Sequence, residues 1–315
     1  MSFFSGVQQI GIGVRDAVSA YNWYKSNLGF GLKLFDDEAE ASLMKNYTGG
    51  EAHSRRAILA LKPEGGRGLE IWQFKSRKPS PTRAIRPGDC GILAAVVGEL
   101  PKEKINKDLL WEGSLGTKDP DGNIFIPAMA TPEAKKGIRG AVIGVRDLQN
   151  AEAFYCDILG FTKVREQDVV WNGVEGKTGV LQLSAKKALF SNLLGPMELQ
   201  LVSCSGVAQE HLFTNRYWGD MGFIHLCFEV PNMDVFKKKT EAAGCKFHVD
   251  SGSSFGMSDA AGRFAYIEDP DGTLIELVET HKIPIIKKLG ISIDLKSYRE
   301  KPIEQWKLNF LRWFN

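Results

Sequence analysis

Three ionisable side chains of this 315-residue chain lie inside apolar, strand-like segments. Glu70 is in GLEIWQF, His225 is in GFIHLCF and Glu276 is in GTLIELV. Because side chains alternate between the two faces of a strand, each carboxylate either faces solvent or is buried with a cation. A histidine between Ile224 and Leu226 is by default a core residue with satisfied hydrogen bonds. Singly these residues indicate no site, although carboxylates and imidazoles are competent ligands for a divalent metal ion.

The elements that carry these residues come from an internal duplication. Residues 6–30, GVQQIGIGVRDAVSAYNWYKSNLGF, align without a gap with residues 137–161, GIRGAVIGVRDLQNAEAFYCDILGF. In the first copy, apolar residues alternate with glycines up to Val14, as in a strand, and helical spacing follows from Ala17 to Tyr24. The closing Leu-Gly-Phe predicts a helix end capped by glycine. A fixed self-similarity of this kind predicts a repeat architecture.

Each copy continues into further strands, so the repeated unit is β-α-β-β-β. Residues 56–74 contain two strand-like runs joined by a Pro/Gly turn, and residues 178–204 repeat this pattern. Two weaker units contain a hairpin across Asp-Pro-Asp-Gly, which is a strong turn signal. The chain is therefore predicted to hold four units, roughly residues 8–75, 88–129, 137–204 and 222–280.

The V-R-D…Y…L-G-F signature, together with the two D-P-D-G hairpins, resembles the vicinal oxygen chelate (VOC) superfamily. This superfamily includes glyoxalase I, extradiol dioxygenases, methylmalonyl-CoA epimerase and bleomycin-resistance proteins. The resemblance implies an α+β fold in which four tandem βαβββ modules form two open, barrel-like β-sheets with flanking helices. It implies a VOC domain at residues 1–130, a second at residues 137–280, and a C-terminal extension at residues 281–315.

In this family, ligands from the first and last strands of paired modules surround a divalent metal ion. Carried over position by position, the resemblance implies a metal site at Gln9, Glu70, His225 and Glu276, with Glu70 and Glu276 as the candidate catalytic groups. Such oxygen and nitrogen donors favour one divalent ion, Zn, Ni, Co, Mn or Fe(II). A ligand glutamate could take a proton next to a metal-bound carbonyl, which predicts isomerase, epimerase or lyase chemistry through an enediolate.

The other two modules are expected to have lost a site of this kind. Their matching positions are assigned to Gly91, Ile126, Gly140 and Glu198. This asymmetry resembles a tandem glyoxalase I-like monomer, in which the first module pairs with the fourth and the second with the third. If the third and fourth modules pair instead, the site would consist of Glu198, His225 and Glu276.

The substrate is expected to be a small molecule other than glutathione. The resemblance places the groups that hold glutathione at Gly13, Phe74 and Met221, none of which is charged. An apolar pocket is a second expectation, against the plainer interpretation of simple packing. Its candidate lining residues are Trp72, Phe74, Trp171, Trp218 and Met221.

Two other functions within the superfamily remain open. An extradiol-type dioxygenase needs two histidines and one carboxylate, so His211 or His248 would have to join the site. A bleomycin-resistance-like protein would bind a small molecule without metal or catalysis. Metal content separates this second alternative from the enzyme.

Composition limits the choice of partners and compartment. Lys and Arg number 40 against 38 Asp and Glu, which gives no indication of nucleic-acid binding. No apolar run is long enough to span a membrane, and five cysteines without a Cys-x-x-Cys pair predict reduced thiols in a cytoplasmic protein. Residues 303–314 predict a basic aromatic helix that packs on a barrel or a homodimer partner, or binds a membrane surface.

Overall fold

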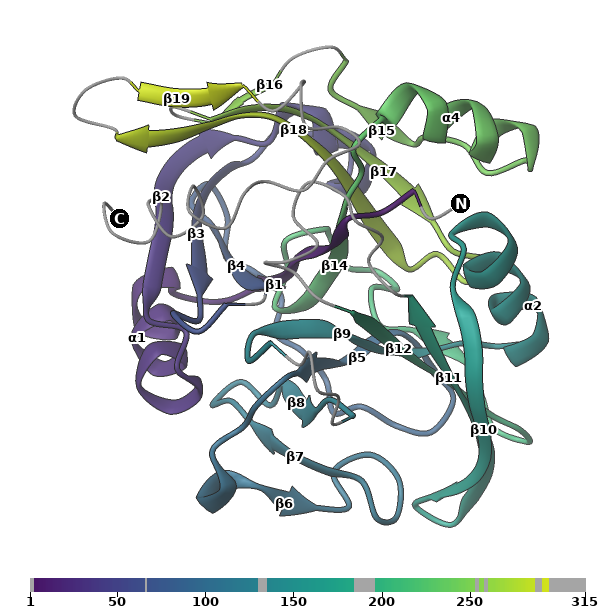
Figure 1. The fold of residues 1–315 in the computed structure, drawn as a ribbon. Coiled ribbons are helices and arrows are strands. Elements are labelled where there is room, and N and C mark those ends of the chain that lie inside the picture. The colour runs from purple at the N-terminus through teal and green to yellow at the C-terminus, as the bar shows by residue number, and fades with distance from the viewer. Residues whose placement is uncertain are drawn as a thin grey trace.

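The strands of the protein form two mixed β-sheets, one in the upper and one in the lower half of Figure 1. The computed structural model describes residues 3–65, 67–129, 135–183, 196–252, 255–257, 260–286 and 291–294. The predicted α+β fold of four modules in two barrel-like sheets is confirmed.

The first and third modules follow the predicted β-α-β-β-β order. The first comprises β1 (Gly6–Gly13), α1 (Ala17–Leu28), β2 (Leu32–Glu40), the 3₁₀ helix η1 (Ser42–Tyr47), β3 (Ser54–Leu61) and β4 (Gly68–Phe74). The third comprises β9 (Ile138–Gly144), α2 (Leu148–Ala153), the π-helical turn η3 (Phe154–Ile158), β10 (Thr162–Trp171), β11 (Val174–Leu183) and β12 (Met197–Cys204). Helix α1 begins where the Asp16 carboxylate accepts the Ser19 N–H, and it ends at Gly29, whose φ of 81° suits glycine.

The second and fourth modules diverge more. The second comprises β5 (Asp89–Val97), a single 3₁₀ turn η2 (Lys102–Lys104), β6 (Asn106–Lys107), β7 (Leu115–Lys118) and β8 (Ile124–Pro127). The fourth comprises β14 (Gly222–Glu229), α4 (Met233–Ala242), β15 (Val249–Asp250), β16 (Phe255–Met257), β17 (Ala260–Glu268) and β18 (Leu274–Ile286). Short strand β13 (Glu210–His211) lies before the fourth module, and β19 (Ile291–Asp294) follows it.

Each sheet combines modules that are far apart in sequence. The first sheet has the strand order β15-β17-β18-β14-β1-β4-β3-β2, and the second has the order β10-β11-β12-β9-β5-β8-β7-β6. Antiparallel pairing of β1 with β14 joins the first module to the fourth, and pairing of β5 with β9 joins the second to the third. The division into domains at residues 1–130 and 137–280 stays a prediction. Each sheet takes strands from both of these ranges.

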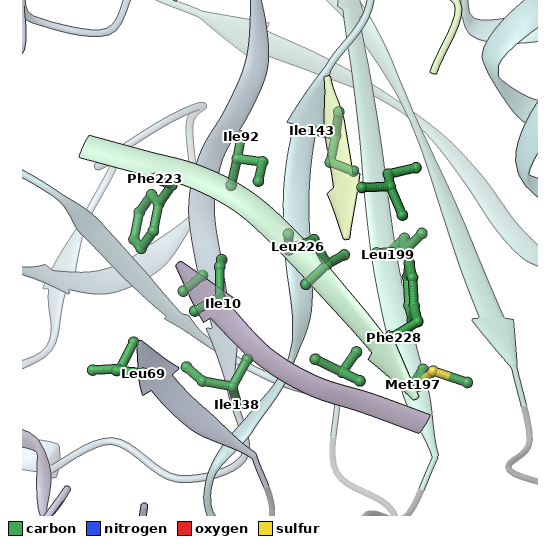
Figure 2. Packing of buried hydrophobic residues seen from close by; sticks show 14 of the residues in the cluster. Ile10, Leu69, Ile92, Ile138, Ile143, Met197, Leu199, Phe223, Leu226 and Phe228 are labelled. Atoms are coloured by element: carbon green, nitrogen blue, oxygen red, sulfur yellow. The ribbon is translucent and has the colours of Figure 1, made fainter. Parts of the chain in front are cut away.

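A shared apolar core fills the space between the sheets (Figure 2). Ile10 and Leu226 of the first sheet pack in one cluster with Ile138 and Leu199 of the second. Burial of one such side chain contributes roughly 1.5–3 kcal/mol. Since side chains alternate along each strand, the intervening residues face the opposite, concave side of each sheet.

Two equivalent hydrogen bonds tie the modules across this core. Tyr24 of α1 donates its hydroxyl to Asp119 at 2.6 Å, and Tyr155 of η3 donates to Asp269 at 3.0 Å. Each aspartate opens one of the Asp-Pro-Asp-Gly turns. Asp119 joins two strands of the second sheet, whereas Tyr24 belongs to a module of the first sheet, and Asp269 and Tyr155 have the reverse arrangement. Burial raises the pKa of Asp119, and it raises the pKa of Asp269 to about 6.

The predicted C-terminal extension begins as a continuation of the fold. Strand β18 runs past residue 280 to Ile286, and β19 pairs with it in the antiparallel direction. The helix expected at residues 303–314 lies outside the described residues. Among the described helices, none has the length and apolar character needed to cross a membrane.

Replacing Tyr155 by phenylalanine is expected to lower the free energy of unfolding by about 1–3 kcal/mol at pH 7.5, because a buried carboxylate loses a donor. The loss should shrink below pH 5. Since the folded-state pKa of Asp269 is already raised to about 6, the carboxyl is protonated there and needs no donor. Urea unfolding at both pH values measures the difference.

Tyr21→Phe is the matched control for this experiment. The Tyr21 hydroxyl donates to the neutral carbonyl of Gly31 at 2.9 Å, so its loss should cost the same at both pH values. A pH-independent loss in Tyr155→Phe would contradict an ionised Asp269 at neutral pH.

Candidate metal centre

Three sequence-predicted residues meet on the concave face of the first sheet. His225 Nε2 lies 3.2 Å from Glu70 Oε2 and 3.2 Å from Glu276 Oε2. His225 is fully buried, and Glu70 and Glu276 are only 5% and 8% exposed. Among the described residues, these three form the one group of histidine, cysteine and carboxylate side chains compact enough to hold a metal ion, with candidate ligand atoms within 4.8 Å of one another.

The strand register brings the triad together around Gly11. In the antiparallel pair β1–β14, Gly11 lies opposite His225, and in the parallel pair β1–β4 it lies opposite Glu70. A Cβ atom at Gly11 would lie 2.5 Å from the His225 ring, so the imidazole occupies the space that a side chain would fill. The absence of a side chain at Gly11 therefore leaves the space in which the imidazole lies.

A β-bulge directs His225 toward the carboxylates. The pairing shifts between Gly11–His225 and Ile12–Phe223, which leaves Ile224 as the extra residue. Bulges of this kind bend a strand and re-aim the side chains beside them. Glu276 reaches the same point from β18, where it pairs with Cys227 of β14.

Electrostatics in the triad favour a charged imidazole when no cation is present. Burial opposes the charge on His225, but Glu276 and Glu70 outweigh it and raise the His225 pKa to about 9. Burial also opposes ionisation of Glu276, but His225 outweighs it and lowers the Glu276 pKa. The two carboxylates thus hold a proton on His225, and a divalent cation would take its place.

Further side chains position the triad. Gln9 Nε2 donates to Glu276 Oε2 at 3.3 Å, so the structure also brings the fourth predicted residue to the site. Tyr266 Oη lies 3.4 Å from His225 Nδ1, and the Trp218 ring stacks on the imidazole at 6.2 Å between centroids. Gly11 and Tyr266 did not emerge from the sequence, because their roles depend on which strands pair.

The donor geometry fits a divalent ion. Two ligand atoms about 2.1 Å from a metal and roughly perpendicular about it lie about 3 Å apart, close to the 3.2 Å observed here. The buried His225 Nε2 makes neither contact with hydrogen-bond geometry, which leaves it as an orphaned polar atom directed toward the carboxylates. Two carboxylates, one imidazole and the Gln9 amide would suit ions with oxygen and nitrogen ligands.

No equivalent triad is found among the described residues of the second sheet. Its register places Val142 opposite Ala94 and Gln200, just as Gly11 lies opposite His225 and Glu70. The matching positions are therefore Ala94 instead of the expected Gly91, and Gln200 instead of the expected Glu198. The difference arises because a few residues of strand offset cannot be detected where two modules share little sequence.

Glu198 does not join His225 and Glu276, since it belongs to the second sheet. Its carboxylate accepts the Met129 N–H at 3.0 Å and the Gln200 side-chain amide at 2.8 Å. The alternative site from paired third and fourth modules is thus not assembled in this fold.

The predicted pocket residues are divided between several places. Trp72 packs against Trp218 on the concave face of the first sheet, with ring centroids 4.3 Å apart. Trp171 packs instead in the core of the second sheet, because β10 belongs to that sheet. Phe74 lies under the Arg77 guanidinium at the end of β4, and Met221 is buried just before β14.

The two histidines considered for a dioxygenase centre lie elsewhere. His211 is on β13 and its Nδ1 accepts the Phe213 N–H at 3.1 Å. His248 is exposed, with Nδ1 3.9 Å from Glu268. Neither belongs to the buried triad.

Comparison with known proteins agrees with this fold. The sequence model of the family described as "Glyoxalase/Bleomycin resistance protein/Dioxygenase superfamily" matches residues 137–277. Crystalline glyoxalase I from Zea mays has the same fold, with a TM-score of 0.55 and 15% identity over 87% of this chain and 92% of that one. The family match thus falls on the third and fourth modules, and the structural likeness extends the same fold over the chain. The resemblance to the VOC superfamily that the sequence indicated is confirmed by this match.

One sequence relative has about the length of a single pair of modules. A "Probable lactoylglutathione lyase" from Synechocystis sp. is 26% identical over 148 residues, which are 44% of this chain and 92% of that protein. In the present chain, the buried triad is split between the first module and the fourth.

Gly11→Ala is expected to weaken metal binding about 10–100-fold, the range found when residues that orient metal ligands are changed. The new methyl group would overlap the His225 ring and push it away from the carboxylates. Calorimetric titration with Ni²⁺ or Zn²⁺ measures the change. Gly31→Ala is the matched control, since its Cβ would lie 3.5 Å from the nearest atom of Lys25. Unchanged affinity in Gly11→Ala would contradict the placement of His225 in the site.

Proposed function

We propose that the protein is a metal-dependent enzyme of the glyoxalase I-like kind, acting by proton transfer next to a carbonyl of a small molecule. The observation that supports it is the buried triad of His225, Glu70 and Glu276, with a ring nitrogen 3.2 Å from each carboxylate. Glu70, His225 and Glu276 would hold one divalent ion, and the Gln9 amide would provide a fourth ligand. Zn, Ni, Co, Mn and Fe(II) all suit these donors.

The bound ion would polarise a substrate carbonyl and make its neighbouring C–H more acidic. The residues of the chain then divide the remaining tasks. Gln9 and His225 both contact Glu276, which holds that carboxylate in place. Glu70 contacts His225 but takes part in no other ion pair or hydrogen bond identified within the described ranges. We assign the proton transfer to Glu70 Oε2, with Glu276 as the second candidate.

The surroundings of the triad would keep water from the reacting atoms. Trp72, Trp218 and Tyr266 form an aromatic cluster on the same concave face, and all three are buried. A low-dielectric site strengthens the interaction between a carboxylate and the proton that it removes. Isomerisation, epimerisation and lyase reactions all begin with removal of a proton next to a carbonyl. The proposal therefore names this class of reaction and no single substrate.

The proposal is favoured over a dioxygenase. A centre with two histidines and one carboxylate is typical of iron(II) oxygenases, whereas the buried group here has one histidine and two carboxylates. It is also favoured over a metal-free binding protein, for which two buried acids beside an imidazole would be a cost without a role. The glutathione anchors remain unmatched at Gly13, Phe74 and Met221, so a different substrate is proposed.

Metal content tests the proposal. Elemental mass spectrometry of the untagged full chain, after reconstitution with the five candidate ions, should find about one equivalent of metal in the wild type, as one set of ligands implies. His225→Ala and Glu276→Ala should lose it, because each removes a ligand side chain. Glu198→Ala is the control, because it makes the same change to a buried glutamate in the second sheet. If the wild-type protein takes up none of these ions, the proposed metal-dependent enzyme function is refuted.

The assignment of Glu70 is tested by hydrogen exchange. Metal-loaded wild-type protein in D₂O should catalyse exchange of the hydrogen on the carbon next to the carbonyl of α-hydroxy ketones or aldehydes. Proton NMR measures the rate at which that hydrogen signal is lost. Glu70→Gln should slow this exchange about 10²–10⁴-fold, the usual contribution of a general base. If metal-loaded Glu70→Gln exchanges as fast as the wild type, Glu70 is not the base.

A further inference from the structure

A cavity lies beside the triad, and apart from Trp218 it is built from residues that the proposed chemistry does not use. Its volume is about 340 Å³, and it lies between η1, the segment 211–218 and the turn that precedes β18. Its lining includes His211, Phe213, Arg216, Tyr217 and Trp218. None of the three metal-binding candidates lines it, although Trp218 stacks on His225 and so separates the two sites.

Arg216 brings a positive charge to this cavity without a carboxylate partner. Its guanidinium donates to three backbone carbonyls, those of Leu212, Ser80 and Met221. Its Nε is buried and bonds to no acceptor in the described part of the chain. No carboxylate among the described residues lies within 4 Å of the guanidinium, which leaves the charge to be balanced by something else.

The nearest acidic candidate is already fully engaged. Asp220 pairs with Arg77 at 2.5 Å and also accepts the backbone N–H groups of Ser80 and Tyr217, both at 2.8 Å. These contacts fix the two segments that connect the modules, residues 75–88 and 205–221, against each other. Asp220 favours the charge on Arg216 at longer range but forms no ion pair with it.

His211 contributes a neutral donor. Its Nδ1 accepts the Phe213 N–H at 3.1 Å, so the proton of the neutral ring must be on Nε2. Burial and the nearby Arg146 lower the His211 pKa, which keeps the ring neutral at pH 7. Nε2 is buried and lacks a hydrogen-bond partner among the described residues. It lies 3.2 Å from the position that a Cβ of Gly91 would take, and Gly91 also lines the cavity.

Trp218 supplies a third buried donor that lacks an acceptor among the described residues. The residue is 3% exposed, and its indole Nε1–H has no acceptor within the described ranges. Arg216, His211 and Trp218 all line the cavity, and each carries a buried donor nitrogen without a partner among the described residues. Buried donors without partners are costly, and an anion with several acceptor lone pairs would satisfy them together.

We propose that this cavity binds the carboxylate of a small organic acid that has an apolar or aromatic body. The three donors would hold the carboxylate, and the rings of Phe213 and Tyr217 would contact the rest of the molecule. One guanidinium matches one negative charge, which favours a carboxylate over a doubly charged phosphate. The idea that this acid is the substrate rests on the proposed function, whereas binding itself requires no metal.

Phenylacetate and its uncharged analogue phenylacetamide are the probes for this site. Both are titrated into chelator-treated full-length protein, with binding followed by saturation-transfer NMR and tryptophan fluorescence. Phenylacetate should bind at least about tenfold more tightly than the amide, since a charged hydrogen bond is about twice as strong as a neutral one. Equal affinity for the two probes, or no phenylacetate binding at about 10 mM, a limit equivalent to only about 2.7 kcal/mol, would overturn the proposal.

Three variants locate the binding. Arg216→Gln should weaken phenylacetate binding more than tenfold, and Trp218→Phe about threefold or more, since each removes a donor. His211→Asn should weaken it similarly while its side-chain oxygen still accepts the Phe213 N–H, so this variant tests the site even if Arg216→Gln unfolds. Arg86→Gln is the control, because Arg86 is an exposed arginine paired with Glu210 that does not line the cavity.

The outcomes separate this proposal from the metal chemistry. Affinity that falls in His211→Asn and Trp218→Phe but not in Arg86→Gln supports a carboxylate site, whatever the metal content proves to be. A uniform fall that includes Arg86→Gln indicates general charge attraction and overturns it. Inorganic phosphate is tested by its ability to displace phenylacetate. If phosphate binds more tightly than phenylacetate, the cavity is a phosphate site and the proposal is overturned.

Discussion

The antiparallel register between β1 and β14 is the constraint on which the candidate site depends. Strand β1 contributes Gly11, which has no side chain, and the two neighbouring strands place His225 and Glu70 on either side of it. A slip of one residue would turn these side chains to the opposite face of the sheet. The apolar residues of β1 that face the other sheet prevent such a slip, because Ile10 and Ile12 would then leave the core. Packing between the sheets thus holds the register that assembles the triad.

The sequence predicted those parts of the structure that depend on local pattern. The duplicated strand and helix, the Gly29 cap and the Asp-Pro-Asp-Gly turns are determined by residues close together in the chain, and each is found in the structure. The metal-binding candidates also lie together, but their prediction came from resemblance to a family and not from periodicity. Nothing in a local pattern indicates that β1 pairs with a strand more than 200 residues later.

Other features could not be read from the sequence for identifiable physical reasons. A strand offset of a few residues leaves no mark where two modules share little sequence, so the equivalent of His225 was placed at Gly91 instead of Ala94. The cavity at Arg216 is formed by a connecting segment without strand or helix periodicity. There the useful signal is the absence of a carboxylate partner for a half-buried arginine, and such an absence is visible only in three dimensions.

The two sheets differ in a way that suits one buried polar site. Two carboxylates and an imidazole on a concave face cost free energy when they are removed from water, unless a cation compensates them. The described strands of the second sheet lack the equivalent groups, and its concave face is filled by an apolar cluster that includes Ala94, Ile126 and Trp171. Because both sheets share the core between them, this apolar packing also stabilises the sheet that carries the triad. The fold therefore lets the apolar packing of one half stabilise the other half, which holds the buried polar groups.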